Sequence, residues 1–94
     1  MLLKDKVVIV SGIGPGLGQE LSTLAAKEGA KAVVLAARTE AKLDVAEREI
    51  NDLGLGTAVL KVATDISDQA QCRALADKTV AEFGRIDVLF NSAY

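Results

Sequence analysis

Short apolar runs alternate along this chain with stretches in which apolar residues recur every three or four positions. The runs are rich in β-branched residues, as is typical of strands buried on both faces, and they lie at about residues 6–11, 32–36, 57–62 and 86–90. The stretches between these runs, in which apolar residues recur every three or four positions, predict amphipathic helices. In the first of these helices Leu17, Leu21, Leu24 and Ala25 recur at helical spacing, and in the second Leu43, Ala46 and Ile50 share one face. The third carries Ala70, Ala74, Val80, Ala81 and Phe83.

Residues that favour helix ends separate these segments. Thr39 and Ser67 stand where hydroxyl side chains can cap the second and third helices. Glycines that can end the helices follow the three patterns, at Gly29, at Gly54 and Gly56, and at Gly84. Local chemistry therefore predicts where the second and third helices begin and where all three end.

Strands and helices that alternate with short connections predict a parallel sheet covered by helices on both faces, since such crossovers are right-handed. We therefore predict one α/β domain over residues 1–94, with a Rossmann-like, doubly wound sheet of strand order 3-2-1-4. The charged Lys61 in the third strand fits a position near the edge of this sheet. Ligands bind such sheets at the carboxyl ends of the strands where the strand order reverses, here between the first and fourth strands.

A glycine-rich turn joins the first strand to the first helix. Glycine tolerates backbone angles closed to other residues, and its lack of a side chain lets a diphosphate approach the main chain. The first turn of the following helix then points unpaired N–H groups and the positive end of its dipole at the anion. The turn that predicts this phosphate site is Ser11-Gly12-Ile13-Gly14-Pro15-Gly16-Leu17-Gly18.

Composition and charge exclude several classes of function. The net charge is −2 and both signs are mixed along the chain, so we expect neither nucleic acid nor an anionic membrane as a partner. The chain has one cysteine, Cys72, and no histidine, so we expect no metal site, and we interpret Cys72 as a small buried helix residue. Without a signal-like apolar stretch, the expected location is cytoplasmic.

Five segments in the right order resemble one family. Ser-Gly-x-x-x-Gly-Leu-Gly at residues 11–18 resembles the Thr-Gly-x-x-x-Gly-Ile-Gly motif of the short-chain dehydrogenases/reductases, and residues 91–94, Asn-Ser-Ala-Tyr, resemble their Asn-Asn-Ala-Gly. Residues 34–38, 64–67 and 84–89 stand where that family has the end of its second strand, its adenine-contacting Asp and its fourth strand. The resemblance implies an NAD(P)-dependent oxidoreductase, of which this chain is the dinucleotide-binding domain.

Carried over to the glycine turn, the resemblance assigns roles in holding the pyrophosphate of a nicotinamide dinucleotide. Gly12, Gly16 and Gly18 would shape the turn. The backbone N–H of Leu17 would donate to the pyrophosphate, and Ser11 would brace the turn. The alternative without a ligand is that the glycines only make a tight connection between strand and helix.

The resemblance also assigns residues to the two nucleoside halves of the cofactor. Asp65 would accept a hydrogen bond from the adenine amino group, and Ile66 would pack or bond there through its main chain. Asn91, Ser92 and Ala93 would line the adenosine ribose and the route to the nicotinamide. Purely local roles remain open, since Asp65 also fits a turn or cap before the third helix and Asn91 a cap at a strand end.

The choice of nucleotide can be argued from charge. A site that prefers NAD generally has a carboxylate at the end of the second strand, where it holds the ribose 2′-hydroxyl. Both candidate positions, Ala36 and Ala37, are uncharged, and Arg38 follows directly. A guanidinium there could bind the 2′-phosphate of NADP(H), so NADP(H) is favoured, although Arg38 also fits a solvated position. Because Gly14 and Pro15 supply no second basic residue, NAD(H) stays possible.

The chain lacks the groups that would complete catalysis. Relatives carry a catalytic Ser and a Tyr-x-x-x-Lys on later segments, whereas Tyr94 is the last residue here and no Lys follows it. Tyr94 and Ser92 also replace a Gly and an Asn of the family motif. We therefore expect binding without turnover, in the N-terminal part of a longer enzyme that acts on a carbonyl or alcohol.

The predicted sheet leaves one edge strand unpaired and apolar. Such an edge can pair with another chain, so we expect a homo-oligomer.

Two other classes of protein stay open. The spacing Gly12-x-Gly14-x-Gly16 also fits the turn of S-adenosylmethionine-dependent methyltransferases, but Ser11 and Ala37 stand where those enzymes usually have acidic residues. A non-catalytic dinucleotide sensor or scaffold would explain why the catalytic residues are missing. Cofactor titration can separate these hypotheses.

Overall fold

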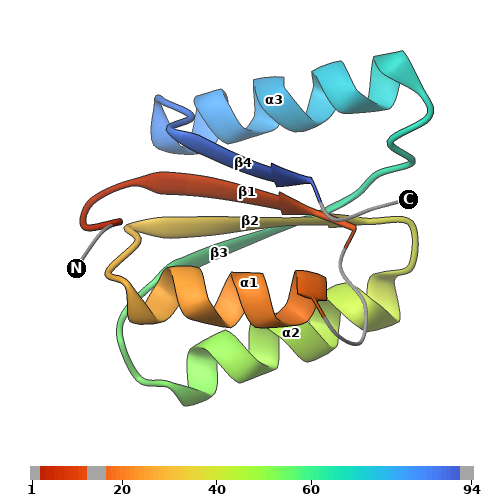
Figure 1. Ribbon diagram of the computed structural model, residues 1–94. Coiled ribbons are helices and arrows are strands. Elements are labelled where there is room, and N and C mark those ends of the chain that lie inside the picture. The colour runs from red at the N-terminus through yellow and green to blue at the C-terminus, as the bar shows by residue number, and fades with distance from the viewer. Residues whose placement is uncertain (1–2, 13–16, 92–94) are drawn as a thin grey trace.

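The computed structural model describes residues 3–12 and 17–91 and contains four strands and three helices in alternation (Figure 1). Gly16, Ser92, Ala93 and Tyr94, which the sequence analysis singled out, lie outside the described residues, as do Gly14 and Pro15. The elements in chain order are β1 (Val7–Ser11), α1 (Leu17–Lys27), β2 (Ala32–Ala37), α2 (Glu40–Asp52), β3 (Ala58–Ala63), α3 (Gln69–Phe83) and β4 (Val88–Asn91).

The four strands form one parallel sheet in the order β3-β2-β1-β4, which confirms the predicted topology. In the β1–β2 pair, Val7 lies opposite Ala32 and Ser11 opposite Ala36. In the β1–β4 pair, Ser11 lies opposite Asn91. The strands therefore run in register, and their carboxyl ends meet at one edge of the sheet.

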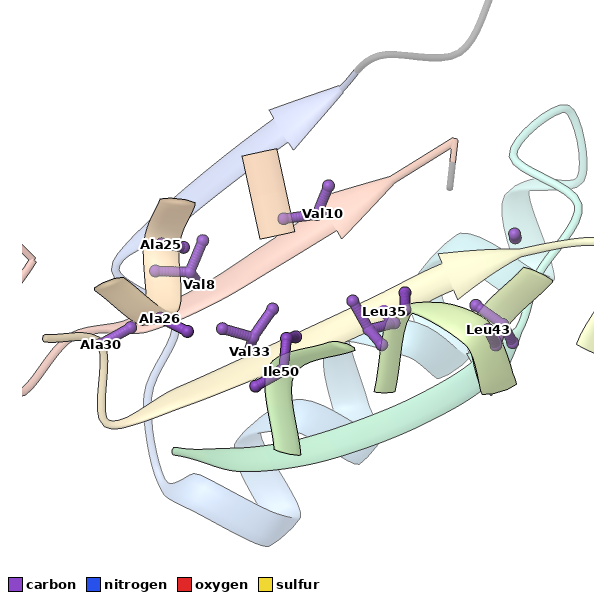
Figure 2. Close-up of a cluster of buried hydrophobic side chains, with 11 residues drawn as sticks. Val8, Val10, Ala25, Ala26, Ala30, Val33, Leu35, Leu43 and Ile50 are labelled. Carbon is purple, nitrogen blue, oxygen red and sulfur yellow. The ribbon is translucent and has the colours of Figure 1, made fainter. Parts of the chain in front are cut away.

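Helices cover both faces of the sheet, with α1 and α2 on one side and α3 on the other (Figure 1). On the first side, Val8, Val10, Val33 and Leu35 pack with α1 and α2, as Figure 2 shows. On the other side, Val7, Ile9, Ala32, Val34 and Ala36 form a second cluster with Val62 of β3 and Leu75 of α3. Both central strands are buried along their whole length, as their continuous apolar runs predict.

The edge strands are more open to solvent than the central ones. Lys61 of β3 is exposed, as predicted, and its ammonium lies 2.8 Å from Asp44 Oδ1 and 3.0 Å from Glu47 Oε1 of α2. Exposed ion pairs of this kind stabilise a fold little. On β4, at the other edge, Leu89 is 60% exposed. The interior of the sheet, rather than its edges, therefore holds the fold together.

Helix α1 approaches the sheet through small residues. Gly18, Ser22, Ala25 and Ala26 are buried, and the Ser22 hydroxyl donates to the carbonyl of Gln19 at 2.8 Å. Small side chains allow the helix to lie close to β1 and β2. The buried face of α1 is set by these small residues, and it leaves Leu24, one of the residues that recur at helical spacing, 51% exposed.

The apolar residues that the sequence places on α3 do not mark its buried face. Ala70, Val80 and Ala81 are exposed, and the buried residues of this helix are Leu75 and Thr79. Thr79 can be buried because its hydroxyl donates to the carbonyl of Leu75 at 2.8 Å. Because a threonine that satisfies its own hydroxyl can be buried, apolar residues alone do not identify the buried face of this helix. In α2, by contrast, Leu43, Ala46 and Ile50 are buried as predicted.

The predicted helix caps are confirmed in part. Thr39 is the N-cap residue of α2, but its side chain makes no capping hydrogen bond. Asp68, not Ser67, caps α3, and its carboxylate accepts from the N–H groups of Ala70 and Gln71. Gly84 ends α3 at a φ of 79°, in the left-handed region that favours glycine.

Asp87 joins β4 to β1 at the amino ends of both strands. Its carboxylate accepts from the N–H of Val7 at 2.8 Å, and its own N–H donates to the carbonyl of Val7 at 3.0 Å. Arg85 Nη2 lies 2.6 Å from Asp87 Oδ1. The Val7 N–H, together with the Arg85 guanidinium, lowers the pKa of Asp87 below its ordinary value of 3.8.

Replacing Asp87 with asparagine is expected to lower the thermal unfolding midpoint at pH 7. Because the pKa of Asp87 is lower in the folded state than in the unfolded state, its carboxylate stabilises the fold above pH 3.8. That contribution is lost as the pH falls through the folded-state pKa. The deficit of the D87N variant should therefore shrink in unfolding scans as the pH falls below 3.8. D77N, at an exposed position on α3, is the control, and an equal deficit at every pH would contradict the role of the charge.

Candidate functional site at the carboxyl edge of the sheet

The ends of β1 and β4 form one part of the candidate site. The Ser11 hydroxyl lies 3.2 Å from Asn91 Oδ1 and 3.5 Å from the carbonyl oxygen of Phe90. Ser11 is buried, whereas Asn91 is exposed. The structure thus brings together two residues that are 80 positions apart in the sequence, both of them predicted site residues.

The glycine turn starts beside the end of β2. Gly12 has a φ of 80°, which a residue with a side chain adopts only with strain, and its N–H donates to the carbonyl of Ala36 at 2.9 Å. Leu17 and Gly18 begin α1, so the chain passes from β1 through the turn into the amino end of that helix. Helix N–H groups at this position can bind an anion.

Arg38 follows directly after β2. Ala36 and Ala37 are buried at the end of that strand. Neither position therefore offers a carboxylate that could hold the ribose 2′-hydroxyl of NAD. Arg38 is exposed at the carboxyl edge of the sheet. The positive charge that was predicted for the cofactor site therefore lies at the carboxyl edge.

Asp65 lies beside Arg38 because β2 and β3 end together. The N–H of Thr64 donates to the carbonyl of Ala37 at 2.8 Å, which ties the end of β3 to the end of β2. The Asp65 carboxylate accepts from the hydroxyl of Ser67 at 2.6 Å and from its N–H at 3.0 Å. These bonds, with a smaller contribution from the Arg38 charge, lower the pKa of Asp65 below its ordinary value. Asp65 is therefore an anion at neutral pH.

Ile66 and Cys72 lie next to Asp65. Ile66 is 38% exposed, and its carbonyl accepts from the thiol of Cys72 at 3.3 Å. Cys72 is half-buried rather than fully buried as predicted, because it lies in the first turns of α3 beside this loop. The bonds of Asp65 to Ser67 form the local turn that the sequence analysis left open as an alternative.

Two residues of this region were not predicted from the sequence. Thr64 is buried, and its hydroxyl donates to the carbonyl of Val62 at 3.0 Å. The side-chain oxygen of Gln71 accepts from the N–H of Asp65 at 2.7 Å. Polar residues around the start of α3 indicate that side chains bond to the backbone there, but the sequence does not show which backbone groups are their partners.

The predicted residues form a row along the carboxyl edge. Across the sheet from β4 to β3, the strand ends present Asn91, then Ser11 and Gly12, then Arg38, then Asp65. The row combines a hydroxyl and an amide side chain, one cation and one carboxylate, which suits a long ligand with anionic groups and hydrogen-bond donors. It offers no cluster for a metal, since the described residues contain no group of three His, Cys, Asp or Glu placed to bind one. Within the same described residues, no helix is long and apolar enough to cross a membrane.

Curated relatives match nearly all of this chain. It is 41% identical over 88 residues to 11-beta-hydroxysteroid dehydrogenase A of Sesamum indicum, an alignment that covers 94% of this chain and 25% of the relative. It is 36% identical over 89 residues to levodione reductase of Leifsonia aquatica, covering 95% of this chain and 33% of the relative. The chain therefore spans a quarter to a third of the length of these enzymes.

Solved structures lead to the same conclusion. The fold matches L-sorbose reductase from Gluconobacter frateurii in complex with NADPH and L-sorbose at a TM-score of 0.88 and 33% identity, over 98% of this chain and 34% of that one. NAD+-bound xylitol dehydrogenase matches at a TM-score of 0.89 and 27% identity, over 100% of this chain and 35% of that one. In sequence, residues 6–93 match the family described as short chain dehydrogenase. The chain thus belongs to the short-chain dehydrogenase/reductase family, as its five motifs indicated.

Proposed function

We propose that this chain binds NADP(H) along the carboxyl edge of its sheet and serves a hydride transfer between that cofactor and a carbonyl or alcohol. The observation that carries the proposal is the pair formed by Arg38 and Asp65 where β2 and β3 end. A guanidinium at the end of the second strand suits the 2′-phosphate of NADP(H). A carboxylate beside it suits a donor such as the adenine amino group.

The order of groups across the sheet fits the order of groups in the cofactor. Arg38 and Asp65 would hold the adenosine phosphate end, and Gly12 with the amino end of α1 would hold the diphosphate. Ser11 and Asn91 lie beyond them, on the route to the nicotinamide. Gly16, Leu17, Gly18, Ile66, Ser92 and Ala93 complete the proposed set.

The reaction itself is proposed from the family. The L-sorbose reductase structure contains NADPH and the xylitol dehydrogenase structure contains NAD+, so both cofactors occur among the structural relatives. When bound, the nicotinamide supplies or accepts a hydride. The residues of this chain would bind and orient the cofactor, and the proton of the reaction needs a positioned acid or base, for which the Tyr-x-x-x-Lys pattern does not occur within residues 1–94.

Titration with NADPH, NADH and S-adenosylmethionine tests the proposal. We expect NADPH to bind more tightly than NADH, and S-adenosylmethionine not to bind, as measured by calorimetry with the full chain. Binding of S-adenosylmethionine alone would overturn the proposal. Binding of a nicotinamide cofactor without turnover of any carbonyl or alcohol by the full-length protein would favour a sensor or scaffold.

The cytoplasmic location and the homo-oligomer stay predictions. The exposed Leu89 on the edge strand β4 is compatible with further pairing there. Sedimentation of the full chain would measure the oligomeric state.

A further inference from the structure

The loop of residues 64–68, here called the Asp65 loop, holds its carboxylate in one orientation. Both bonds from Ser67, from the N–H at 3.0 Å and the hydroxyl at 2.6 Å, reach the same oxygen, Oδ1 of Asp65. Among the described residues, no hydrogen bond reaches Oδ2. Asp65 therefore has one oxygen engaged within the loop and a second available to a ligand.

Gln71 fixes the backbone of this loop from the first turn of α3. Its side-chain Oε1 accepts from the N–H of Asp65 at 2.7 Å, while its Nε2 lies 3.3 Å from Oδ2 of Asp68. Asp68 is itself the N-cap residue of α3 and donates its N–H to the carbonyl of Asp65 at 3.0 Å. Gln71 thus links the Asp65 loop to a helix end that is already fixed by its cap.

We propose that Gln71 is a positioning residue for adenine recognition, acting through the backbone of Asp65. This inference rests on the proposed function, since it requires that Asp65 accepts a hydrogen bond from the adenine amino group. The carboxylate of Asp65 is directed by its backbone, and without the bond to Gln71 the Asp65 N–H would lose its partner, so that this exposed loop would sample more orientations. By accepting from the Asp65 N–H, Gln71 reduces the conformational freedom that the ligand would otherwise have to remove.

The effect of Gln71 should depend on the Asp65 carboxylate. Replacing Gln71 with leucine removes both side-chain bonds at nearly constant size. Replacing Asp65 with asparagine keeps an oxygen that can accept from Ser67, but it places an amide N–H₂ opposite the adenine amino group. Two donors then face each other, so a correctly oriented loop no longer increases the affinity for NADPH. A residue that acts through Asp65 will therefore lose its influence in the D65N background.

The experiment measures NADPH dissociation constants for the wild type, Q71L, D65N and the double variant of the full chain. We expect Q71L to weaken NADPH binding about three- to tenfold in the wild-type background, the size of one net hydrogen bond. In the D65N background the same change should weaken binding by less than about twofold. Equal losses in both backgrounds, or no loss in the wild-type background, would overturn the proposal.

Two controls keep this outcome separate from other failures. Q69L changes the same residue type two positions earlier on α3, where Gln69 is exposed, and should leave NADPH binding unchanged. Thermal unfolding of each variant reports whether the fold is intact, and Q71L should unfold close to the wild type because the Gln71 bonds are exposed. If the wild type itself does not bind NADPH, the proposed function fails rather than the role of Gln71.

Discussion

Replacing Leu35 with alanine is expected to destabilise the fold by about 2–5 kcal/mol, the range for deleting a fully buried leucine side chain. Leu35 lies in the central strand β2 with no exposed surface and packs in the cluster between the sheet and helices α1 and α2 (Figure 2). The neighbouring strands are hydrogen-bonded to β2 on both sides, so the cavity cannot collapse without breaking the sheet. Chemical unfolding of both proteins measures the loss.

The matched control is the same substitution at Leu24. This leucine is 51% exposed on α1, so its replacement by alanine should change the free energy of unfolding by less than about 0.5 kcal/mol. A domain of this size has little stability to lose, so the L35A variant should be purified and measured at low temperature. Equal stabilities of L35A and L24A would contradict the packing of β2 described above.

The sheet could be predicted from sequence because its strands are buried on both faces. Val33, Val34 and Leu35 belong to a continuous apolar run, and its short length and β-branched residues favour a strand over a helix. The strand order could be predicted because strands alternate with helices and the crossover connections between parallel strands are right-handed. The helix faces were harder, since Leu24 and Val80 are apolar but exposed, while Ser22 and Thr79 are polar but buried with their hydroxyls bonded to the helix backbone.

The candidate site was predictable to the extent that it depends on strand ends. Ser11, Arg38, Asp65 and Asn91 all follow or end apolar runs, and a parallel sheet brings such positions to one edge. The bond from the Asp65 N–H to Gln71 was not predictable, because it depends on where α3 begins. The sequence favoured Ser67 as the cap, whereas capping by Asp68 is what directs Gln71 back toward the loop.

Replacing Arg38 with aspartate is expected to weaken NADPH binding about tenfold to a hundredfold, the effect of losing hydrogen bonds to a charged group. The guanidinium can donate two bonds to the 2′-phosphate, whereas a carboxylate repels it. Asp65 nearby adds a second negative charge, which increases the repulsion once Arg38 is gone. NADH carries a 2′-hydroxyl instead, and the new carboxylate can accept a hydrogen bond from it, so NADH binding should hold or improve.

Arg48→Asp is the matched control for this prediction, because it makes the same change of charge at an exposed position on α2. A loss of NADPH affinity that came from net charge alone would appear in both variants and would fade as salt is raised. A loss that came from contact with the 2′-phosphate would appear only at Arg38 and would spare NADH. Calorimetric titration of the two variants with both cofactors separates these cases, and equal losses for NADPH and NADH at Arg38 would show that this residue does not recognise the 2′-phosphate.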